Sequence, residues 1–257
     1  MNIAVVVRQV PDLIEPLDVA SSGTALDLGA ASFILNESDD HALEQALLLK
    51  EAVGGTVTVV ALNFGDIDNT LYTASAKGAD KIIKIAYEAE STPEPSVAAA
   101  AYAEVIRELA PDLVLVGSYA HDELENTLAP LLAFRLGLPF VGVVRGVKPL
   151  ADAAGATIYK EFPGAALAQM TVKFPAVLGI LGAEQPPRYV PVSRIRAAMK
   201  TTQVSDQEVA LPAPVSPVTI QRLYPPEAGK GAEILEGSCE EVAARIVSIL
   251  KEKGVMK

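Results

Sequence analysis

The two histidines of the sequence each lie next to carboxylates, an arrangement found in acid–base and metal sites. His41 follows Asp39 and Asp40, and His121 precedes Asp122. A carboxylate can orient an imidazole for proton transfer, and the two groups together can ligate a metal ion. Two histidines with no cysteine beside them do not favour a metal site, so we expect none. We expect no catalytic residue either, and both histidines to be structural or to line a pocket.

Two polar segments could contact a ligand. Asn126 and Thr127 could hydrogen-bond to a ribose, while the acids of Asp122–Glu125 could begin a helix, where carboxylates interact favourably with the helix dipole. The segment Asn36–Asp39 could likewise cap a helix predicted to start near Asp40, and capping does not exclude contact with a nucleotide. Both interpretations of each segment are open at this point.

Composition excludes several classes of protein. The 257 residues carry a net charge of −11, and basic residues gather only between Arg188 and Lys200. Contacts to a phosphate backbone need clustered Lys and Arg, so nucleic-acid binding is not expected. No apolar run reaches the roughly 18 residues of a spanning helix, so membrane insertion is not expected. The single cysteine and the lack of a signal peptide predict a cytoplasmic protein.

Hydrophobic periodicity predicts strands that alternate with helices. Strands are expected at 3–10, 56–62, 81–86, 113–117, 140–144 and 176–181, and helices at 40–53, 66–77, 97–109 and 123–136. This alternation predicts a doubly wound α/β fold with a parallel sheet. Ligands of such sheets bind beyond the carboxyl ends of the strands, here at residues 8–12, 63–66 and 118–126. No G-x-G-x-x-G motif follows a strand, so a Rossmann dinucleotide site is not predicted.

The pattern changes after residue 145. Segments 157–162 and 168–174 flank Pro163-Gly164 and predict a hairpin. Residues 1–200 are predicted to form one α/β domain, and residues 201–257 a proline-rich extended arm with a C-terminal helix for partner contact. That helix should be capped by Ser238 and run to about Lys253. Such an arm could wrap its own domain, wrap a partner or be a loosely packed tail.

Four segments, taken together, resemble the electron transfer flavoprotein beta subunit family. They are Val7-Arg8-Gln9-Val10-Pro11-Asp12, Asn36 with the following ALEQALLLKE at 42–51, Ala74-Ser75-Ala76-Lys77-Gly78-Ala79-Asp80, and Pro186-Pro187-Arg188-Tyr189. Their order and spacing match the family across about residues 1–200.

The resemblance implies a subunit that moves electrons and is not itself an enzyme. It implies an adenine-nucleotide-binding domain that forms a heterodimer with an alpha subunit, and the alpha subunit mainly holds the FAD. The beta subunit is expected to hold AMP or a second FAD. Electrons are expected to pass from dehydrogenases to an acceptor of the quinone-reductase type, and the flavin supplies the chemistry while the protein positions it.

The resemblance also assigns site residues. The residues that it places beside the base, ribose and phosphate of the nucleotide are Val6, Asn36, Glu37, Ser38, Asp39, Phe64, Gly117, Ser118, Tyr119, Ala120, His121, Asp122, Asn126, Thr127 and Leu128. The residues that it places in the segment that recognises redox partners are Arg188, Tyr189, Val192, Arg194 and Arg196. A plain solvated basic patch is the alternative interpretation of this second set.

One segment departs from the family pattern. Many relatives carry Asp-Gly-Asp-Thr, then Gln and Gly, where this chain has Asp122-Glu123-Leu124-Glu125-Asn126. Ionised Glu123 and Glu125 would oppose a bound phosphate by about 1 kcal/mol each at an effective dielectric between those of water and protein. The sequence therefore leaves three alternatives: a beta subunit with its own nucleotide, a beta subunit that has lost it, and a nucleotide-binding sensor of the same fold.

Overall fold

The structure is a computed structural model that describes residues 1–257 except 30, 89–91, 214–218, 226–228, 230 and 257. The chain forms two compact units, Met1–Arg222 and Leu223–Lys257. Residues 214–218, 226–228, 230 and 257 of the predicted arm lie outside the described residues. Within the described chain, no helix is long and apolar enough to cross a membrane.

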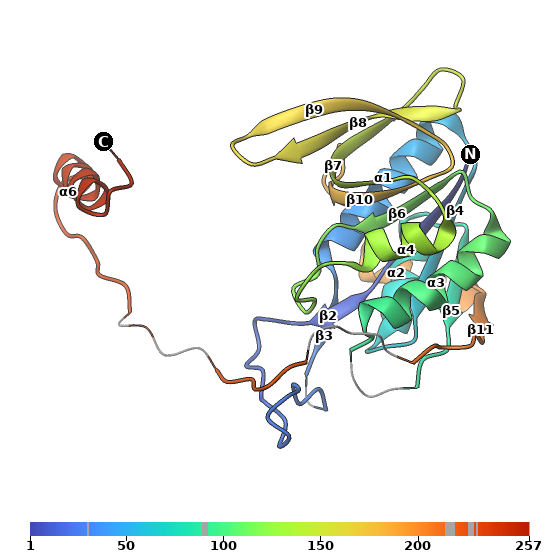
Figure 1. Cartoon of the computed structure of the whole chain (residues 1–257), viewed down its shortest axis with the longest axis horizontal. Helices are drawn as coiled ribbons and strands as arrows, with labels where there is room; N and C mark the ends of the chain where they lie inside the picture. Colours follow the sequence, from blue (N-terminus) through green and yellow to red (C-terminus); the bar gives the residue numbers. More distant parts are fainter. Residues whose placement is uncertain (30, 89–91, 214–218, 226–228, 230, 257) are drawn as a thin grey trace. The chain divides into compact units, whose positions relative to one another are not determined.

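The first unit is built on a sheet that has nine strands within the described residues. In spatial order they are β11 (Val204–Gln207), β5 (Lys81–Ile85), β4 (Thr56–Leu62), β1 (Asn2–Val6), β6 (Leu113–Gly117), β10 (Ala176–Gly182), β7 (Phe140–Pro149), β8 (Gly155–Phe162) and β9 (Ala166–Lys173). Neighbours from β11 to β7 are parallel, whereas β7, β8 and β9 pair antiparallel (Figure 1). The predicted α/β fold and the predicted hairpin are confirmed.

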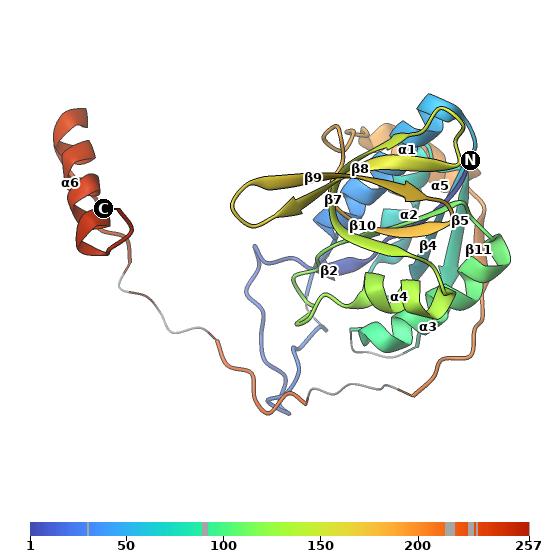
Figure 2. The same cartoon turned by 45° about the horizontal axis from the view of Figure 1, so that its top comes forward.

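Helices cover both faces of the parallel part of the sheet. Helices α1 (Glu37–Val53) and α2 (Ile67–Lys77) pack on one face, and α3 (Pro95–Leu109) and α4 (Leu128–Leu136) pack on the other (Figures 1 and 2). The chain adds β4 and β5 on one side of β1 and then returns to place β6 on the other side. The strand order thus reverses between β1 and β6, and doubly wound sheets bind ligands beyond the carboxyl ends at such a point.

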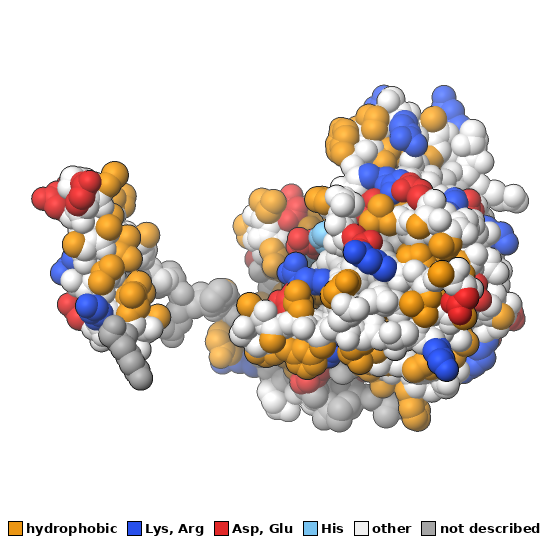
Figure 3. Space-filling view, turned by 90° about the horizontal axis from the view of Figure 1, so that it is seen from above, with side chains coloured by type: hydrophobic (Ala, Val, Ile, Leu, Met, Phe, Trp, Pro, Cys, Tyr) orange, Lys and Arg blue, Asp and Glu red, His pale blue; other side chains and the backbone are white. Residues whose placement is uncertain are grey.

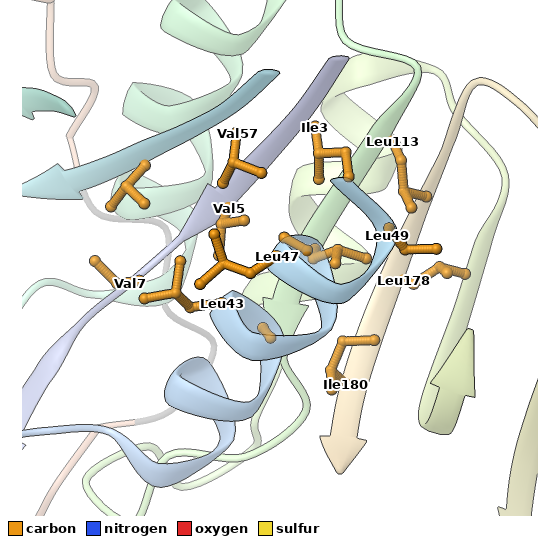
Figure 4. Packing of buried hydrophobic residues seen from close by; sticks show 14 of the residues in the cluster. Ile3, Val5, Val7, Leu43, Leu47, Leu49, Val57, Leu113, Leu178 and Ile180 are labelled. Atoms are coloured by element: carbon orange, nitrogen blue, oxygen red, sulfur yellow. The ribbon is translucent and has the colours of Figure 1, made fainter. Parts of the chain in front are cut away.

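Alternating side chains of β1 reach the two faces of the sheet. Ile3 and Val5 pack against α1, where Figure 4 shows Leu43 and Leu47 beside them. Val6 faces the opposite side and belongs to the core under α3 and α4. Each fully buried side chain of this size contributes about 1.5–3 kcal/mol relative to leaving it in water. Two apolar layers therefore hold the carboxyl ends of β1 and β6 in fixed positions.

The first strand is shorter than predicted, because the chain leaves the sheet at Arg8. The expected strand at 3–10 divides into β1 and β2 (Gln9–Pro11), and β2 pairs antiparallel with β3 (Phe33–Leu35) in a separate small sheet. The backbone N–H of Arg8 donates to the carboxylate of Asp39 at 3.0 Å instead of to a neighbouring strand. The Asp39 side chain thus ends the hydrogen-bond ladder of β1, and the local hydrophobic pattern of the sequence does not predict this.

The predicted arm also begins too early. Residues 192–201 form helix α5 (Val192–Thr201), which packs against α2 through Ala198, and residues 204–207 form the edge strand β11 beside β5. Strand β11 has one aliphatic residue, Val204, so it carries no hydrophobic signal. Extension of the sheet past residue 201 was therefore missed.

The second unit contains helix α6 (Cys239–Glu252), as predicted. Ser238 caps it: its side chain accepts from the N–H of Glu241, whose carboxylate accepts from the N–H of Ser238 in return. None of the side chains of α6 is buried, and Ile246 and Val247 are among its exposed apolar residues. Figure 3 shows hydrophobic side chains along this helix.

Candidate functional site

Arg8 occupies the point where the strand order reverses. Its guanidinium donates to both carboxylate oxygens of Asp39, from Nε at 2.9 Å and from Nη2 at 3.0 Å, and its Nη1 pairs with Glu123. Nη2 also lies 3.5 Å from the carbonyl oxygen of Gly117. The Arg8 side chain is 13% exposed, that of Asp39 0% and that of Glu123 9%. We call Arg8, Asp39 and Glu123 the Arg8 cluster.

Asp39 connects the three elements that meet at this point. It lies in the first turn of α1, and its carboxylate accepts from the backbone N–H of Gly117 at the end of β6 at 2.8 Å. Position 117 has no room for a side chain, because an added Cβ would lie 2.3 Å from Asp39 Oδ1. Asp39 therefore fixes Arg8 at the carboxyl ends of β1 and β6.

Burial sets the electrostatics of this region. Desolvation raises the pKa of Glu123, and the nearby Arg8 cation offsets this only in part. The pKa of Asp122 is raised for the same reason. Burial also raises the pKa of Tyr102, whose hydroxyl accepts from the backbone N–H of Leu62 at 3.2 Å. The site thus gathers more negative charge than its one guanidinium balances.

A narrow cavity, the inner pocket, opens beside Arg8. It is lined by Arg8, Gln9, Leu62, Phe64, Thr92, Pro93, Ala98, Tyr102, Asp122, Glu123 and Leu128. Its free volume of about 30 Å³ leaves room for about two water molecules. Among the residues that the structure describes, Gln9 Oε1 is a buried acceptor without a hydrogen-bond partner, while Gln9 Nε2 donates to Asp66 O and Thr70 Oγ1. Such an unsatisfied acceptor marks a position where a donor of a ligand could bind.

A wider depression, the outer pocket, lies next to it. It is lined by Val10, Ile34, Asn36, Glu37, Ser38, Tyr119, Ala120, His121, Glu123 and Asn126, and its free volume is about 500 Å³. Seven of the residues that the sequence assigned to a cofactor line it: Asn36, Glu37, Ser38, Tyr119, Ala120, His121 and Asn126. Three others, Phe64, Asp122 and Leu128, line the inner pocket. The described structure therefore brings ten predicted residues into two adjacent pockets.

The remaining predicted cofactor residues lie behind the pockets or beside them. Val6 is fully buried in the core, and Asp39 and Gly117 lie below Arg8. Ser118 Oγ accepts from the N–H of Val143 at 3.1 Å. Thr127 precedes α4 and lines neither pocket. None of these five lines either pocket.

Hydrogen bonds hold the outer pocket together. Asn36 Nδ2 donates to the carbonyl oxygen of Tyr119 at 2.7 Å, and His121 Nε2 lies 2.7 Å from the carbonyl oxygen of Pro11. His41 lies elsewhere, where its Nδ1 accepts from the N–H of Ala183 at 3.3 Å. Each histidine thus contacts a backbone segment, and His121 also lines the outer pocket.

The prediction of a helix from Glu123 was wrong. Helix α4 begins at Leu128, and its first turn contains no acidic residue. Asn126 has a positive φ of 50°, and its Oδ1 accepts from the N–H of Ala120 at 2.7 Å, which closes the preceding residues into a loop. Glu123 turns toward Arg8 and away from a helix terminus. The helix-dipole interpretation of Asp122–Glu125 is therefore excluded.

Sequence reasoning missed three residues at the centre of the site: Arg8, Gln9 and Tyr102. Arg8 had a visible signal, because it is a cation directly after a run of buried apolar residues at a predicted strand exit. Tyr102 had none, since an aromatic residue within an apolar helix also fits an ordinary core position. Glu123 was interpreted as a charge that opposes phosphate or as part of an acidic helix start, and not as the partner of Arg8.

The predicted partner segment contains a second ion cluster. Arg188 donates to Glu44 from Nη2 at 2.8 Å and from Nε at 3.0 Å, and to Glu51 from Nη1 at 2.7 Å. We call Arg188, Glu44 and Glu51 the Arg188 cluster. Tyr189 is 84% exposed, and the three other predicted contact residues, Val192, Arg194 and Arg196, are also exposed. Arg188 thus fixes the segment to α1, while its neighbours face solvent.

Comparison with known proteins identifies the family. The family model described as the electron transfer flavoprotein domain matches residues 27–213. The chain is 31% identical to the electron transfer flavoprotein subunit beta of Methylophilus methylotrophus over 98% of both chains, and 31% identical to that of Clostridium acetobutylicum over 98% and 99%. It is 29% identical, over the full length of both chains, to the caffeyl-CoA reductase-Etf complex subunit CarD of Acetobacterium woodii. The chain belongs to the electron transfer flavoprotein beta subunit family.

Proposed function

We propose that the chain is the beta subunit of an electron transfer flavoprotein, pairs with an alpha subunit that carries FAD, and shuttles electrons between dehydrogenases and an acceptor. The observation that carries this proposal is similarity over nearly the whole length of chains named subunit beta. The FAD supplies the redox chemistry when it is bound in the complex. The residues of this chain contribute a rigid scaffold, a second ligand site and surfaces for partners.

The second ligand is proposed to be an adenine mononucleotide of the AMP type, bound at the two pockets. Leu62, Phe64 and Leu128 offer an apolar wall for a planar base, and Gln9 Oε1 is an acceptor in need of a donor. The guanidinium of Arg8 suits a phosphate, because its planar donors match the oxygens of that group. A second FAD fits less well, since the diphosphate of FAD brings more negative charge against Asp122 and Glu123.

The second unit is proposed to contact the alpha subunit. Helix α6 is stably capped and amphipathic, and within its own unit none of its side chains is buried. An amphipathic helix gains stability mainly by burying its apolar face, so a groove on a partner chain accounts for this design. Ile246 and Val247 are exposed apolar residues of α6 and are available for such a contact.

The segment after β10 is proposed to meet the redox partners. The Arg188 cluster fixes its start to α1, so that Tyr189 and Val192 are presented on a rigid base. Arg194 and Arg196 are exposed cations that can steer an acidic partner toward this surface.

Co-expression with the alpha subunit of the same organism tests the proposal. The two chains should co-purify through size exclusion as one yellow species with the visible absorption of oxidised flavin. A chain lacking residues 239–257 should lose the partner and the colour, while the double variant Lys251→Gln and Lys253→Gln on the polar side should keep both. Two colourless proteins that elute separately would contradict the proposal.

A further inference from the structure

Glu123 stands between the two pockets. It is the one residue, within the described chain, that lines both the inner and the outer pocket. The residues that the family resemblance assigned to a single nucleotide are thereby divided, with Phe64 and Leu128 on one side and Asn36 and Tyr119 on the other. The inner pocket, with about 30 Å³ of free volume, is also far below the several hundred Å³ of an ordinary ligand site.

The Glu123 carboxylate occupies the donor of Arg8 that an anionic ligand would need. Nε and Nη2 of Arg8 are directed at Asp39 and at the carbonyl oxygen of Gly117, and Nη1 is directed at Glu123. Asp39 is fully buried and is fixed by the N–H of Gly117. Only Glu123 lies in a loop, so it is the partner of Arg8 that can leave without dismantling the sheet.

The loop can release Glu123 while keeping its shape. Its closure depends on the hydrogen bond between Asn126 Oδ1 and the N–H of Ala120, with a backbone contact from the N–H of Glu123 to the carbonyl oxygen of Ala120 at 3.2 Å. Neither involves the Glu123 side chain. In its present position the carboxylate is desolvated and faces Asp39 and Asp122, so rotation into water relieves both costs.

We propose that Glu123 is a built-in competitor for the anion site at Arg8, and that the phosphate of an adenine nucleotide reaches Arg8 only when Glu123 is displaced. This inference rests on the proposed nucleotide site. Displacement also joins the inner and outer pockets into one cleft, which brings the two groups of assigned residues to a single ligand. The glutamate that replaces the small residues of the family is thus a determinant of phosphate affinity in this chain.

Calorimetric titration of the full-length chain tests the proposal with AMP and adenosine as probes. Replacing Glu123 by Gln removes the charge, and Glu123→Ala removes the carboxylate altogether. Both should bind AMP at least about tenfold more tightly than the parent chain, a change equivalent to about 1.4 kcal/mol. Adenosine lacks the phosphate, so its affinity should rise by clearly less than that of AMP. The control Glu125→Gln removes the same charge from an exposed position of the same loop, where water screens it, and should change AMP affinity by much less than either Glu123 variant.

Two results would overturn the inference, and they are distinguishable. Equal AMP affinity in the parent chain and both Glu123 variants, with adenosine still bound, would show that Glu123 does not compete, while the nucleotide site would stand. Failure of AMP and adenosine to bind any of the folded variants would remove the nucleotide site and the competitor together. Far-ultraviolet circular dichroism of each variant confirms that the comparison is made between folded proteins.

Discussion

The Arg8 and Arg188 clusters are built alike and behave differently. Each is an arginine that holds one buried carboxylate with two donors and a second carboxylate with one. At Arg8 the pKa of the second acid, Glu123, is raised because desolvation outweighs pairing. At Arg188 the pKa of the second acid, Glu51, is lowered because its hydrogen bond to Arg188 outweighs desolvation.

Exposure explains the difference. The Glu51 side chain is 57% exposed and keeps its water, whereas the Glu123 side chain is 9% exposed and has lost most of it. A carboxylate that keeps its hydration gains from a nearby cation, while a buried one must first recover its desolvation penalty. A cluster in which the surroundings raise the pKa of a carboxyl group, and so disfavour its ionised form, is typical of a functional site. A cluster that favours the ionised form is typical of a structural ion pair.

The largest expected effect comes from removing each arginine. Replacement of Arg8 by Met leaves Asp39 buried without its cation and should lower the free energy of unfolding by about 3–5 kcal/mol. Replacement of Arg188 by Met should cost less, about 1.5–3 kcal/mol, because water can reach the position that its partly exposed side chain vacates. Urea unfolding followed by circular dichroism measures both. Equal losses would remove the distinction between the clusters.

The next effect concerns the space around Asp39. Gly117→Ala forces a Cβ to within 2.3 Å of Asp39 Oδ1, and overpacking of this kind costs about 1–3 kcal/mol. The matched control is Gly182→Ala at the end of β10, where an added Cβ meets only Arg145 Cγ at 3.9 Å. The control should be close to neutral in the same unfolding experiment. A neutral Gly117→Ala would show that the Arg8 cluster is not tightly fixed from below.

A smaller effect distinguishes the two second acids. Glu123→Gln removes a charge that the folded state disfavours, so at neutral pH it should leave stability unchanged or raise it. Glu51→Gln removes a favourable but solvent-screened pair and should lower stability by less than about 1 kcal/mol. Thermal unfolding of the two variants at pH 7 and low salt gives the signs. Destabilisation by Glu123→Gln larger than by Glu51→Gln would reverse the comparison.

The pH dependence gives the smallest and most specific signal. The raised pKa of Glu123 means that the native state keeps a proton that the unfolded chain has lost, so stability falls as pH rises above the ordinary value of 4.5. The lowered pKa of Glu51 has the opposite sign, and its stabilisation is lost as pH falls below 4.5. The difference in unfolding free energy between the parent chain and each Gln variant, measured from about pH 3 to pH 7, should therefore slope in opposite directions. Parallel slopes would contradict the assigned shifts.

Much of the fold followed from periodicity, because buried elements leave a local signal. The strands β1, β4, β5 and β6 are short apolar runs, and the helices between them carry apolar faces and glycine stops at Gly54 and Gly78. What failed depended on contacts between distant residues. The end of β1 is set by Asp39, 31 residues away from Arg8. The loop before α4 places the Glu123 side chain against Arg8, 115 residues away, and this contact has no local signal in the sequence.

The strand-exit rule and the family resemblance both pointed to the region of the two pockets. The strand-exit rule selected 8–12, 63–66 and 118–126, and residues of all three segments line the two pockets. The division into two pockets was not predictable, because Glu123 lines both of them and its side chain pairs with Arg8, which is distant in the sequence. The same limit applies to Arg188, whose basic character suggested a partner contact although its donors are directed at Glu44 and Glu51.

Native mass spectrometry of the chain co-expressed with its alpha subunit tests its assignment as the beta subunit of an electron carrier. We expect a complex with one copy of each subunit and one bound FAD, which is released only when the complex dissociates. A beta chain that is observed alone, or a heterodimer without flavin, would contradict assignment of this protein as the beta subunit of an electron carrier.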